Sequence, residues 1–256
     1  MSTYLWQNFL KDSQIIKCIS DSIQSLFDKS WAKALIEIWP WKWAITKRIF
    51  KISDSFFVIE KDETMLSYLQ WIWLTDKQII MWDVLEQDIV DILWSVSICE
   101  NEAIVVWNLP YYITSPIFKH LFWKEEPKLL WGFFMIQDEV WEKIRSDANK
   151  KSYLWWLLNR AYTVEYVKTV PAKCFSPAPK VKSCLVRLTK KKNVERVDFE
   201  SLLEFLNLFS PYSRKTLWKI SKMIRKKWGK SYDIPEALLK SRLEELSWNQ
   251  LEEIIS

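Results

Sequence analysis

Residues 34–43 read ALIEIWPWKW, an apolar run that ends at Ile38 and is followed at once by a proline and three tryptophans. A short run that is apolar almost throughout is typical of a strand buried on both faces. Similar runs recur at 55–60, 78–81, 103–106 and 131–137, with helix-like or turn-like stretches between them. Apolar strands that alternate with helices predict a parallel sheet covered on both faces, so the expected fold class is α/β, doubly wound.

The segments around these runs complete the expected fold. Residues 13–28 carry isoleucines at helical spacing behind a polar start, which predicts an amphipathic helix. Two strand-like runs within 164–188 flank the proline-rich stretch FSPAPKV and predict a hairpin at the sheet edge. From about residue 191 the pattern becomes helical, in FESLLEFLNLF, LWKISKMIRKK and PEALLKSRLEELS. We therefore expect an α/β domain over 1–190 and a small helical C-terminal domain over 191–256.

Composition excludes several classes of protein. No run of about 18 apolar residues occurs, and the first twelve residues do not have the zones of a signal peptide, so we expect a cytoplasmic protein. The four cysteines are scattered and predict neither a disulfide framework nor a zinc site. The single histidine, His120, makes a hydrolase with a histidine base improbable, and we expect it on a helix face without a special role.

The net charge of +5 is concentrated late in the chain. A basic surface of this kind binds polyanions by releasing counterions, although a basic helix face is often only solvated. The residues that we single out as an RNA-binding surface are Arg214, Lys215, Lys222, Arg225, Lys226 and Lys227.

The chain has 2 glycines and 18 tryptophans, whereas a globular chain of this length has roughly 18 glycines. Trp39, Trp41 and Trp43 fall where a tight turn is expected, and such turns need positive φ or close backbone approach, which glycine allows and an indole obstructs. We infer that most of the tryptophans stand for glycine, as follows if UGA codons are read as glycine. At Trp155, Trp156, Trp218 and Trp248 the sequence leaves both residues open.

Three strand ends then carry groups that suit a nucleoside-containing cofactor. With glycine at 39, 41 and 43 the first turn reads E-I-G-P-G-K-G, which lets backbone approach a ligand. Glu60 ends the next strand and can accept both ribose hydroxyls, and Asp83 follows the third and can accept from an adenine amino group. The loop is not the G-x-G-x-x-G of NAD-binding proteins.

The tetrapeptide Asn108-Leu109-Pro110-Tyr111 follows the strand at 103–106. It resembles the (N/D/S)-P-P-(Y/F) motif of methyltransferases that act on exocyclic amino groups of bases. The Asn108 amide oxygen and the Leu109 carbonyl can accept the two N6 hydrogens of adenine, and Tyr111 can stack on a base splayed out of its helix. Alone, this tetrapeptide would be read as an Asn-Pro turn with a core tyrosine.

Several motifs in order resemble the KsgA family, the small-subunit (16S) rRNA adenine N6,N6-dimethyltransferases. They are Gln7-Asn8-Phe9-Leu10, NLPYYITSPIF at 108–118, Gln137 to Val140, and VPAKCFSPAPKVKSCLVRL at 170–188. The resemblance implies a Rossmann-like S-adenosylmethionine-dependent methyltransferase fold with a helical, RNA- or ribosome-binding tail. It also implies a monomer that acts on small ribosomal subunit RNA, in the pre-30S particle, during ribosome biogenesis.

The family's residue roles carry over by position. Catalysis would fall to Asn108, Leu109 and Tyr111, while Tyr111 and Phe175 would stack on the target base. Around S-adenosyl-L-methionine the resemblance places Asn8, Leu10, position 39 (written Trp39), Glu60, Asp83 and Asn108. No metal is implied. Phe175 is otherwise a plain packing residue before a proline turn.

Two other functions stay open. One is the related large-subunit rRNA adenine N6-methyltransferase family of the macrolide-resistance type, which shares the fold and the N-x-P-Y chemistry. The other is a non-catalytic ribosome-assembly or RNA-binding factor, which would follow if the tryptophans are literal, because an indole at Trp39 or Trp41 would fill the cofactor site.

Overall fold

The structure is a computed structural model. It describes residues 8–40, 44–99, 102–108, 114–122, 124, 129–145, 147–148, 150–195 and 197–256, with the backbone alone at residue 108. In that part of the chain no helix is long and apolar enough to cross a membrane.

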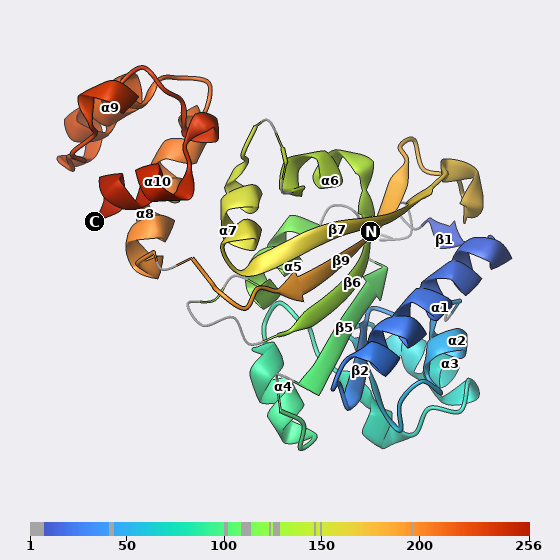
Figure 1. The fold of residues 1–256 in the computed structure, drawn as a ribbon. Helices are drawn as coiled ribbons and strands as arrows, with labels where there is room; N and C mark the ends of the chain where they lie inside the picture. The colour runs from blue at the N-terminus through green and yellow to red at the C-terminus, as the bar shows by residue number, and fades with distance from the viewer. Residues whose placement is uncertain are drawn as a thin grey trace.

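A seven-stranded sheet with the order β4-β3-β2-β5-β6-β9-β7 forms the centre of the molecule (Figure 1). Five neighbouring strands are parallel: β4 (Ile79–Met81), β3 (Ser55–Glu60), β2 (Ala34–Ile38), β5 (Ala103–Asn108) and β6 (Trp131–Gln137). The last two, β9 (Ser183–Lys190) and β7 (Tyr162–Val170), pair in antiparallel fashion. The strands predicted at 34–38, 55–60 and 131–137 are confirmed residue by residue, and β5 extends two residues beyond its predicted end.

Helices cover both faces of the sheet, as the α/β assignment predicts. On one face lie α1 (Ser13–Lys29), α2 (Thr46–Ile49) and α3 (Leu66–Trp71), and their apolar residues form one core with the strands. On the other face lie α4 (Ile89–Ser95), α5 (Thr114–Phe122), α6 (Asp138–Ile144) and α7 (Tyr153–Ala161), which share a second core. Single 3-10 turns lie at Glu63–Met65, Asp76–Gln78, Ala172–Cys174, Ser210–Tyr212, Glu236–Leu238 and Leu243–Glu245.

Helix α1 confirms the amphipathic helix predicted at 13–28. It begins where the Asp12 carboxylate accepts from the backbone N–H groups of Gln14 and Ile15, which satisfies donors that have no partner inside the helix. Its buried residues are those at the predicted spacing, Ile15, Ile19, Ile23 and Leu26. The buried face fixes α1 against the sheet and so fixes the segment that precedes it.

The predicted edge hairpin is confirmed by β7 and β9. A β-bulge interrupts their register between Tyr166 and Lys168. The connection between them contains β8 (Phe175–Ser176), which pairs in antiparallel fashion with β1 (Phe9–Leu10) in a separate two-stranded sheet. The backbone N–H groups of Lys11 and Asp12 extend this contact by donating to the Cys174 carbonyl. The start of the chain is thus tied to the hairpin connection.

The C-terminal helices α8 (Phe199–Phe209), α9 (Leu217–Trp228) and α10 (Trp248–Ile255) surround a third apolar core. This core also contains Trp155, Trp156 and Leu157 of α7. The rings of Trp155 and Trp248 stack with centroids 6.0 Å apart, and Trp156 meets Trp248 edge-on. The C-terminal core therefore includes residues of α7, a helix that lies before the domain boundary predicted at residue 191.

The prediction of a helix through PEALLKSRLEELS (235–247) is wrong. The structure has two 3-10 turns there, at Glu236–Leu238 and Leu243–Glu245, and α10 begins only after Ser247. The Leu239 and Ser241 carbonyls accept from the first N–H groups of α9, those of Trp218 and Leu217. Because these carbonyls cap another helix, the segment folds around the N-terminus of α9 instead of continuing as a helix.

Two tryptophans have backbone in the left-handed region, Trp39 with φ 61° and Trp73 with φ 77°. Trp73 follows the end of α3, where its N–H donates to the Gln70 carbonyl, and its side chain is 85% exposed. A left-handed residue just after a helix is most often glycine, since an L side chain there costs roughly 1 to 2 kcal/mol. Both backbones support the inference that tryptophan stands for glycine at such turns.

We expect Trp73→Gly to raise the free energy of unfolding by about 1 kcal/mol, because it removes the left-handed strain without loss of buried surface. Urea denaturation followed by circular dichroism measures the change. The matched control is Trp94→Gly, at an exposed position inside α4, which should lower stability by up to about 1 kcal/mol. Equal destabilisation by both variants would contradict the strain at residue 73.

Candidate functional site

The candidate residues meet at one edge of the sheet because their strands are parallel. Ile38 at the end of β2 pairs with Ile59 on one side and with Trp107 on the other, and Glu60 pairs with Met81. The residues that follow, among them Trp39, Asp83 and Asn108, therefore lie at the carboxyl ends of adjacent strands. In an open α/β sheet this is where ligands bind, and β2 is the strand from which the order runs in both directions.

Glu60 is 1% exposed, and its two carboxyl oxygens differ in their hydrogen bonds. Its Oε1 accepts from the backbone N–H groups of Lys61 and Asp62 at 2.8 and 2.9 Å. Its Oε2 is buried without a hydrogen-bond partner in the described part of the chain. Burial raises the pKa of this carboxyl to about 7, against the effect of the two backbone N–H groups. A buried acceptor without a donor suits a ligand hydroxyl.

Glu37 lies beside Glu60, one strand away. It is 3% exposed, and its Oε2 has no partner among the described residues. Burial raises the pKa of the Glu37 carboxyl to about 8; the Thr46 hydroxyl opposes the shift and the Glu60 charge adds to it. Burial thus leaves both carboxyls at the floor of the site only partly ionised at neutral pH.

Asp83 stands at the open side of the same edge, with its side chain 22% exposed. Its Oδ1 accepts from the Leu85 N–H at 3.0 Å, and its Oδ2 pairs with the Lys61 ammonium at 3.2 Å. The Lys61 ammonium also lies 5.0 Å from the centroid of the Trp39 ring. Lys61 therefore bridges Asp83 and the indole across the place where a ligand between Glu60 and Asp83 would lie.

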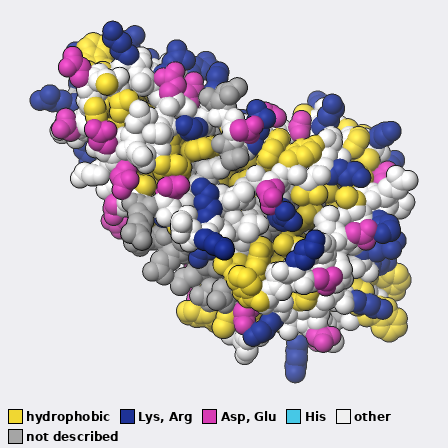
Figure 2. Space-filling view, in the orientation of Figure 1, with side chains coloured by type: hydrophobic (Ala, Val, Ile, Leu, Met, Phe, Trp, Pro, Cys, Tyr) yellow, Lys and Arg dark blue, Asp and Glu magenta, His cyan; other side chains and the backbone are white. Residues whose placement is uncertain are grey.

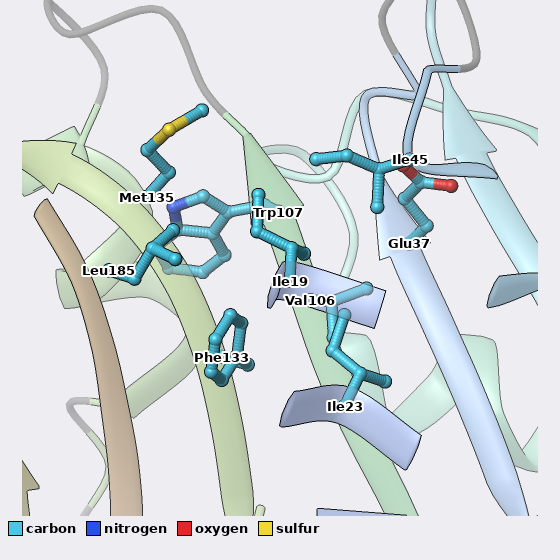
Figure 3. Close-up of a pocket in the computed structure, with 9 residues that line it drawn as sticks. All are labelled: Ile19, Ile23, Glu37, Ile45, Val106, Trp107, Phe133, Met135 and Leu185. Carbon is cyan, nitrogen blue, oxygen red and sulfur yellow. The ribbon is translucent and has the colours of Figure 1, made fainter. Parts of the chain in front are cut away.

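Trp107 fills the neighbouring space at the end of β5. Its ring is 3% exposed and stacks on Phe134 with centroids 3.7 Å apart, while its indole N–H is buried without a partner among the described residues. Figure 3 shows Trp107 and Glu37 at the ends of β5 and β2, around a residual cavity of about 10 Å³. That volume holds at most one water. Beside Glu37, the Trp107 indole therefore leaves no room for a larger ligand group.

Asn8, Leu10 and Phe175 are brought together by the β1–β8 pairing, in which Leu10 lies opposite Phe175. Asn8 is partly buried and Leu10 is 5% exposed. Phe175 is 2% exposed and belongs to the apolar core on the α1 side. Its predicted stacking on a base therefore requires the ring to turn out of this core, whereas its alternative reading as a packing residue does not.

Other candidate residues lie outside the described residues. These are Trp6, Trp41, Trp43, Leu109 and Tyr111, together with the side chain of Asn108. The backbone of Asn108 ends β5, as the sequence predicts, opposite Met135 of β6.

The predicted RNA-binding residues are exposed on α9 and on the turn before it (Figure 2, upper left). Lys222 lies 3.9 Å from the centroid of the Trp218 ring, and Lys227 lies 4.4 Å from that of Trp228. His120 lies on α5, as predicted, with Nε2 2.7 Å from the Gln87 carbonyl oxygen. It joins α5 to the segment before α4.

Sequence reasoning gave no role to Lys61 or to the Glu37 carboxyl. The register of β2 on β3 identifies Glu37, since it sets this residue opposite Val58, two residues before Glu60. Its contacts with Asp83 and the Trp39 ring identify Lys61. A charged residue inside an apolar run, as in ALIEI, was the one available sequence signal for Glu37.

The family model for ribosomal RNA adenine dimethylase matches residues 2–254. The chain belongs to this family. A ribosomal RNA small subunit methyltransferase A of Mycoplasma mycoides is 34% identical over 227 residues, 84% of this chain and 80% of that protein. One of the same name from Parabacteroides distasonis is 32% identical over 255 residues, 98% of this chain and 91% of that protein.

Solved structures share the fold of this dimethylase. A dimethyladenosine transferase from Plasmodium falciparum superposes with a TM-score of 0.69 at 18% identity, over 96% of this chain and 95% of that one. The 23S rRNA methyltransferase ErmE superposes with a TM-score of 0.63, also at 18% identity, over 97% of this chain and 98% of that one. The Rossmann-like methyltransferase fold predicted from the sequence is thus confirmed.

S-adenosylmethionine is the cofactor of this dimethylase. Within the described residues Glu60 Oε2 has no partner and the Asp83 carboxylate is partly exposed, so the two fit a ribose and an adenine amino group at this edge. The indole of Trp39 does not fit, because Lys61 packs against it across the same space. Glycine at position 39 would remove this obstacle and release Lys61.

We expect the stability of the protein to fall as pH rises from about 5 to 8. Glu37 keeps its proton in the folded state up to a pKa of about 8, while the unfolded chain loses it near 4.5. The folded state therefore binds more protons across this window, and the free energy of unfolding falls by an amount on the order of a few kcal/mol. Glu37→Gln should flatten the profile, measured as Tm against pH.

Glu60 contributes a smaller slope of the same sign, so the Glu37→Gln profile should not become level. The exposed Glu63 is the control, and Glu63→Gln should leave the profile as it is. An unchanged slope in Glu37→Gln would show that this carboxyl ionises normally in the folded protein.

Proposed function

We propose that this protein transfers methyl groups from S-adenosylmethionine to the N6 of two adjacent adenosines near the 3′ end of small-subunit rRNA. The match of nearly the whole chain to ribosomal RNA adenine dimethylases carries the proposal. The names of its relatives favour the small-subunit RNA over the large-subunit alternative. The proposed setting is the cytoplasm, with the protein acting as a monomer on the pre-30S particle.

In the proposed reaction the residues of the chain position two partners. Glu60 and Asp83 hold the nucleoside part of the cofactor, while the Asn108 amide oxygen and the Leu109 carbonyl accept the two N6 hydrogens of the target adenine. Tyr111 and Phe175 stack on the base, each contributing on the order of 1 to 3 kcal/mol. When bound, the cofactor would supply a methyl group on a sulfonium sulfur, and N6 would lose one proton to solvent for each methyl group that it gains.

We also propose that glycine occupies positions 6, 39, 41, 43, 82 and 107 of the protein as its own cell makes it, with position 73 added on structural grounds. The left-handed backbone at 39 and 73 supports this, as do the indoles that crowd the cofactor edge. At 107 the buried indole N–H lacks a partner among the described residues, and an unpaired buried donor costs roughly 1 to 3 kcal/mol. Trp155, in contrast, donates to the Arg145 carbonyl at 2.9 Å. That bond supports a real tryptophan at 155.

The helical tail, residues 191–256, is proposed as the second RNA contact. Arg214, Lys215, Lys222, Arg225, Lys226 and Lys227 would bind rRNA phosphates. Their exposure along one helix and its preceding turn supports this role.

We expect Asn108→Ala to lower methyl transfer to small-subunit rRNA by roughly 100-fold or more while the fold stays intact. Glu60→Ala should instead raise the Kd for S-adenosylmethionine by about 10-fold or more, since it removes a charged acceptor. Tritium transfer to rRNA and calorimetry measure the two quantities. Retained transfer in Asn108→Ala would remove that residue from catalysis, and an unchanged Kd in Glu60→Ala would remove it from the ribose site.

Calorimetry with S-adenosylmethionine should separate the literal sequence from a version with glycine at 6, 39, 41, 43, 82 and 107. We expect binding only by the glycine version, because Trp39 and Trp107 fill the site in the literal one. Mass spectrometry of tryptic peptides from the native protein gives an independent reading of each position. If both folded versions fail to bind, the non-catalytic RNA-binding factor becomes the better assignment.

A further inference from the structure

The connection between β7 and β9 is basic without compensating acids. Residues 166–183 contain four lysines, Lys168, Lys173, Lys180 and Lys182, and no aspartate or glutamate. All four side chains are exposed, as is that of Lys11 at the end of β1. The helical tail has a second stretch of this kind, since residues 205–232 also contain basic residues and no aspartate or glutamate.

The topology brings these five lysines, here called the lysine rim, to the edge of the sheet where Glu60 and Asn108 lie. Strand β9 runs antiparallel to β6, so its first residue, Ser183, lies opposite the last residue of β6, Gln137. Strand β7 ends opposite the same Ser183, at Val170. The connection at 171–182 therefore lies at the same edge of the sheet as the carboxyl ends of the parallel strands.

The β1–β8 pairing brings Lys11 of the rim close to Lys173. Lys11 donates its backbone N–H to the carbonyl of Cys174, so Lys11 and Lys173 flank one short piece of antiparallel sheet. Phe175, the proposed stacking residue, is the next residue of that piece. The lysine rim thus borders the place where the target base would enter.

The rim has few counter-charges. None of its five ammonium groups makes an ion pair or a hydrogen bond within the described residues. The Asp12 carboxylate interacts electrostatically with the Lys173 ammonium, but this carboxylate already caps α1. Asp138 is a second acid near the rim, and its backbone N–H donates to the Lys182 carbonyl. In Figure 2 the upper right of the molecule shows Lys and Arg side chains around this end of the sheet.

We propose that the lysine rim binds the RNA phosphates on either side of the target adenosines and holds the strand over the site. This rests on the proposed function, and it adds a second phosphate contact to the one on α9. Figure 1 shows α9 and the β1–β8 pair at opposite ends of the molecule, so α9 and the lysine rim would bind separate parts of the RNA. Phosphate contacts of this kind fix position without reading sequence.

The test compares two full-length variants with the same loss of charge. The rim variant combines Lys173→Gln, Lys180→Gln and Lys182→Gln. The control combines Lys29→Gln, Lys51→Gln and Lys77→Gln, three exposed lysines that precede the starts of β2, β3 and β4 and so lie at the opposite edge. Each variant loses three positive charges. Lys11 is left unchanged because Leu10 beside it belongs to the proposed cofactor site.

The probe is a short RNA with two adjacent unpaired adenosines, titrated by fluorescence anisotropy at several salt concentrations. Each phosphate contact to a single strand contributes about 0.7 to the slope of log K against log salt, so the rim variant should lose about 2 from this slope. At about 0.1 M salt its affinity should fall by roughly 10- to 100-fold. The control should match the parent chain.

Methylation kinetics complete the test, with the rim and control substitutions made in the version that carries glycine at 6, 39, 41, 43, 82 and 107. We expect the rim variant to show a raised KM for RNA with kcat and cofactor Kd unchanged. Equal slopes and KM values in the rim and control variants would overturn the rim proposal. Absence of methylation in a folded parent chain that carries these glycines would instead overturn the proposed function, while a slope difference between the variants would still support an RNA contact at the rim.

Discussion

The parallel pairing of β2 with β3 on one side and β5 on the other is the constraint on which the site depends. This pairing aligns the carboxyl ends of β2, β3 and β5. Residues that are 21 or more positions apart in the sequence, such as Ile38 and Ile59, therefore lie at the same edge of the sheet. Both flanking strands are apolar because helices cover both faces, and this burial holds the register. Any shift by one residue would turn Glu37 and Glu60 from the site into an apolar core.

That constraint also explains the electrostatics of the site. Two carboxyls lie next to each other at the ends of buried strands, and water is excluded from both. Burial raises both pKa values, and Lys61 is drawn toward Asp83 rather than toward the buried pair. Within the described residues Glu60 Oε2 has no donor, and a ligand hydroxyl can supply one. The polar part of the site is in this sense built for an occupant.

Much of the fold was predictable because the strands are short, apolar and separated by clear turns. The runs at 34–38 and 55–60 have the observed bounds, and the spacing of Ile15 to Leu26 gave α1. Tertiary contacts decided the rest: carbonyls at 239 and 241 cap α9, which no local pattern reveals. Of the site, strand-end positions placed Glu60 and Asp83. The bridge from Lys61 and the burial of Phe175 depend on register and on the β1–β8 contact, which are not local properties of the sequence.

The bulge in β7 has a consequence for the solubility of the protein. An open sheet has two edge strands, and their free backbone groups can pair with another chain. Strand β4 is only three residues long. Strand β7 is nine residues long, but the irregularity between Tyr166 and Lys168 breaks its run of free donors and acceptors, and a charged side chain follows at once. Neither edge offers a long flat template, so the sheet resists extension into fibrils or edge-to-edge aggregates.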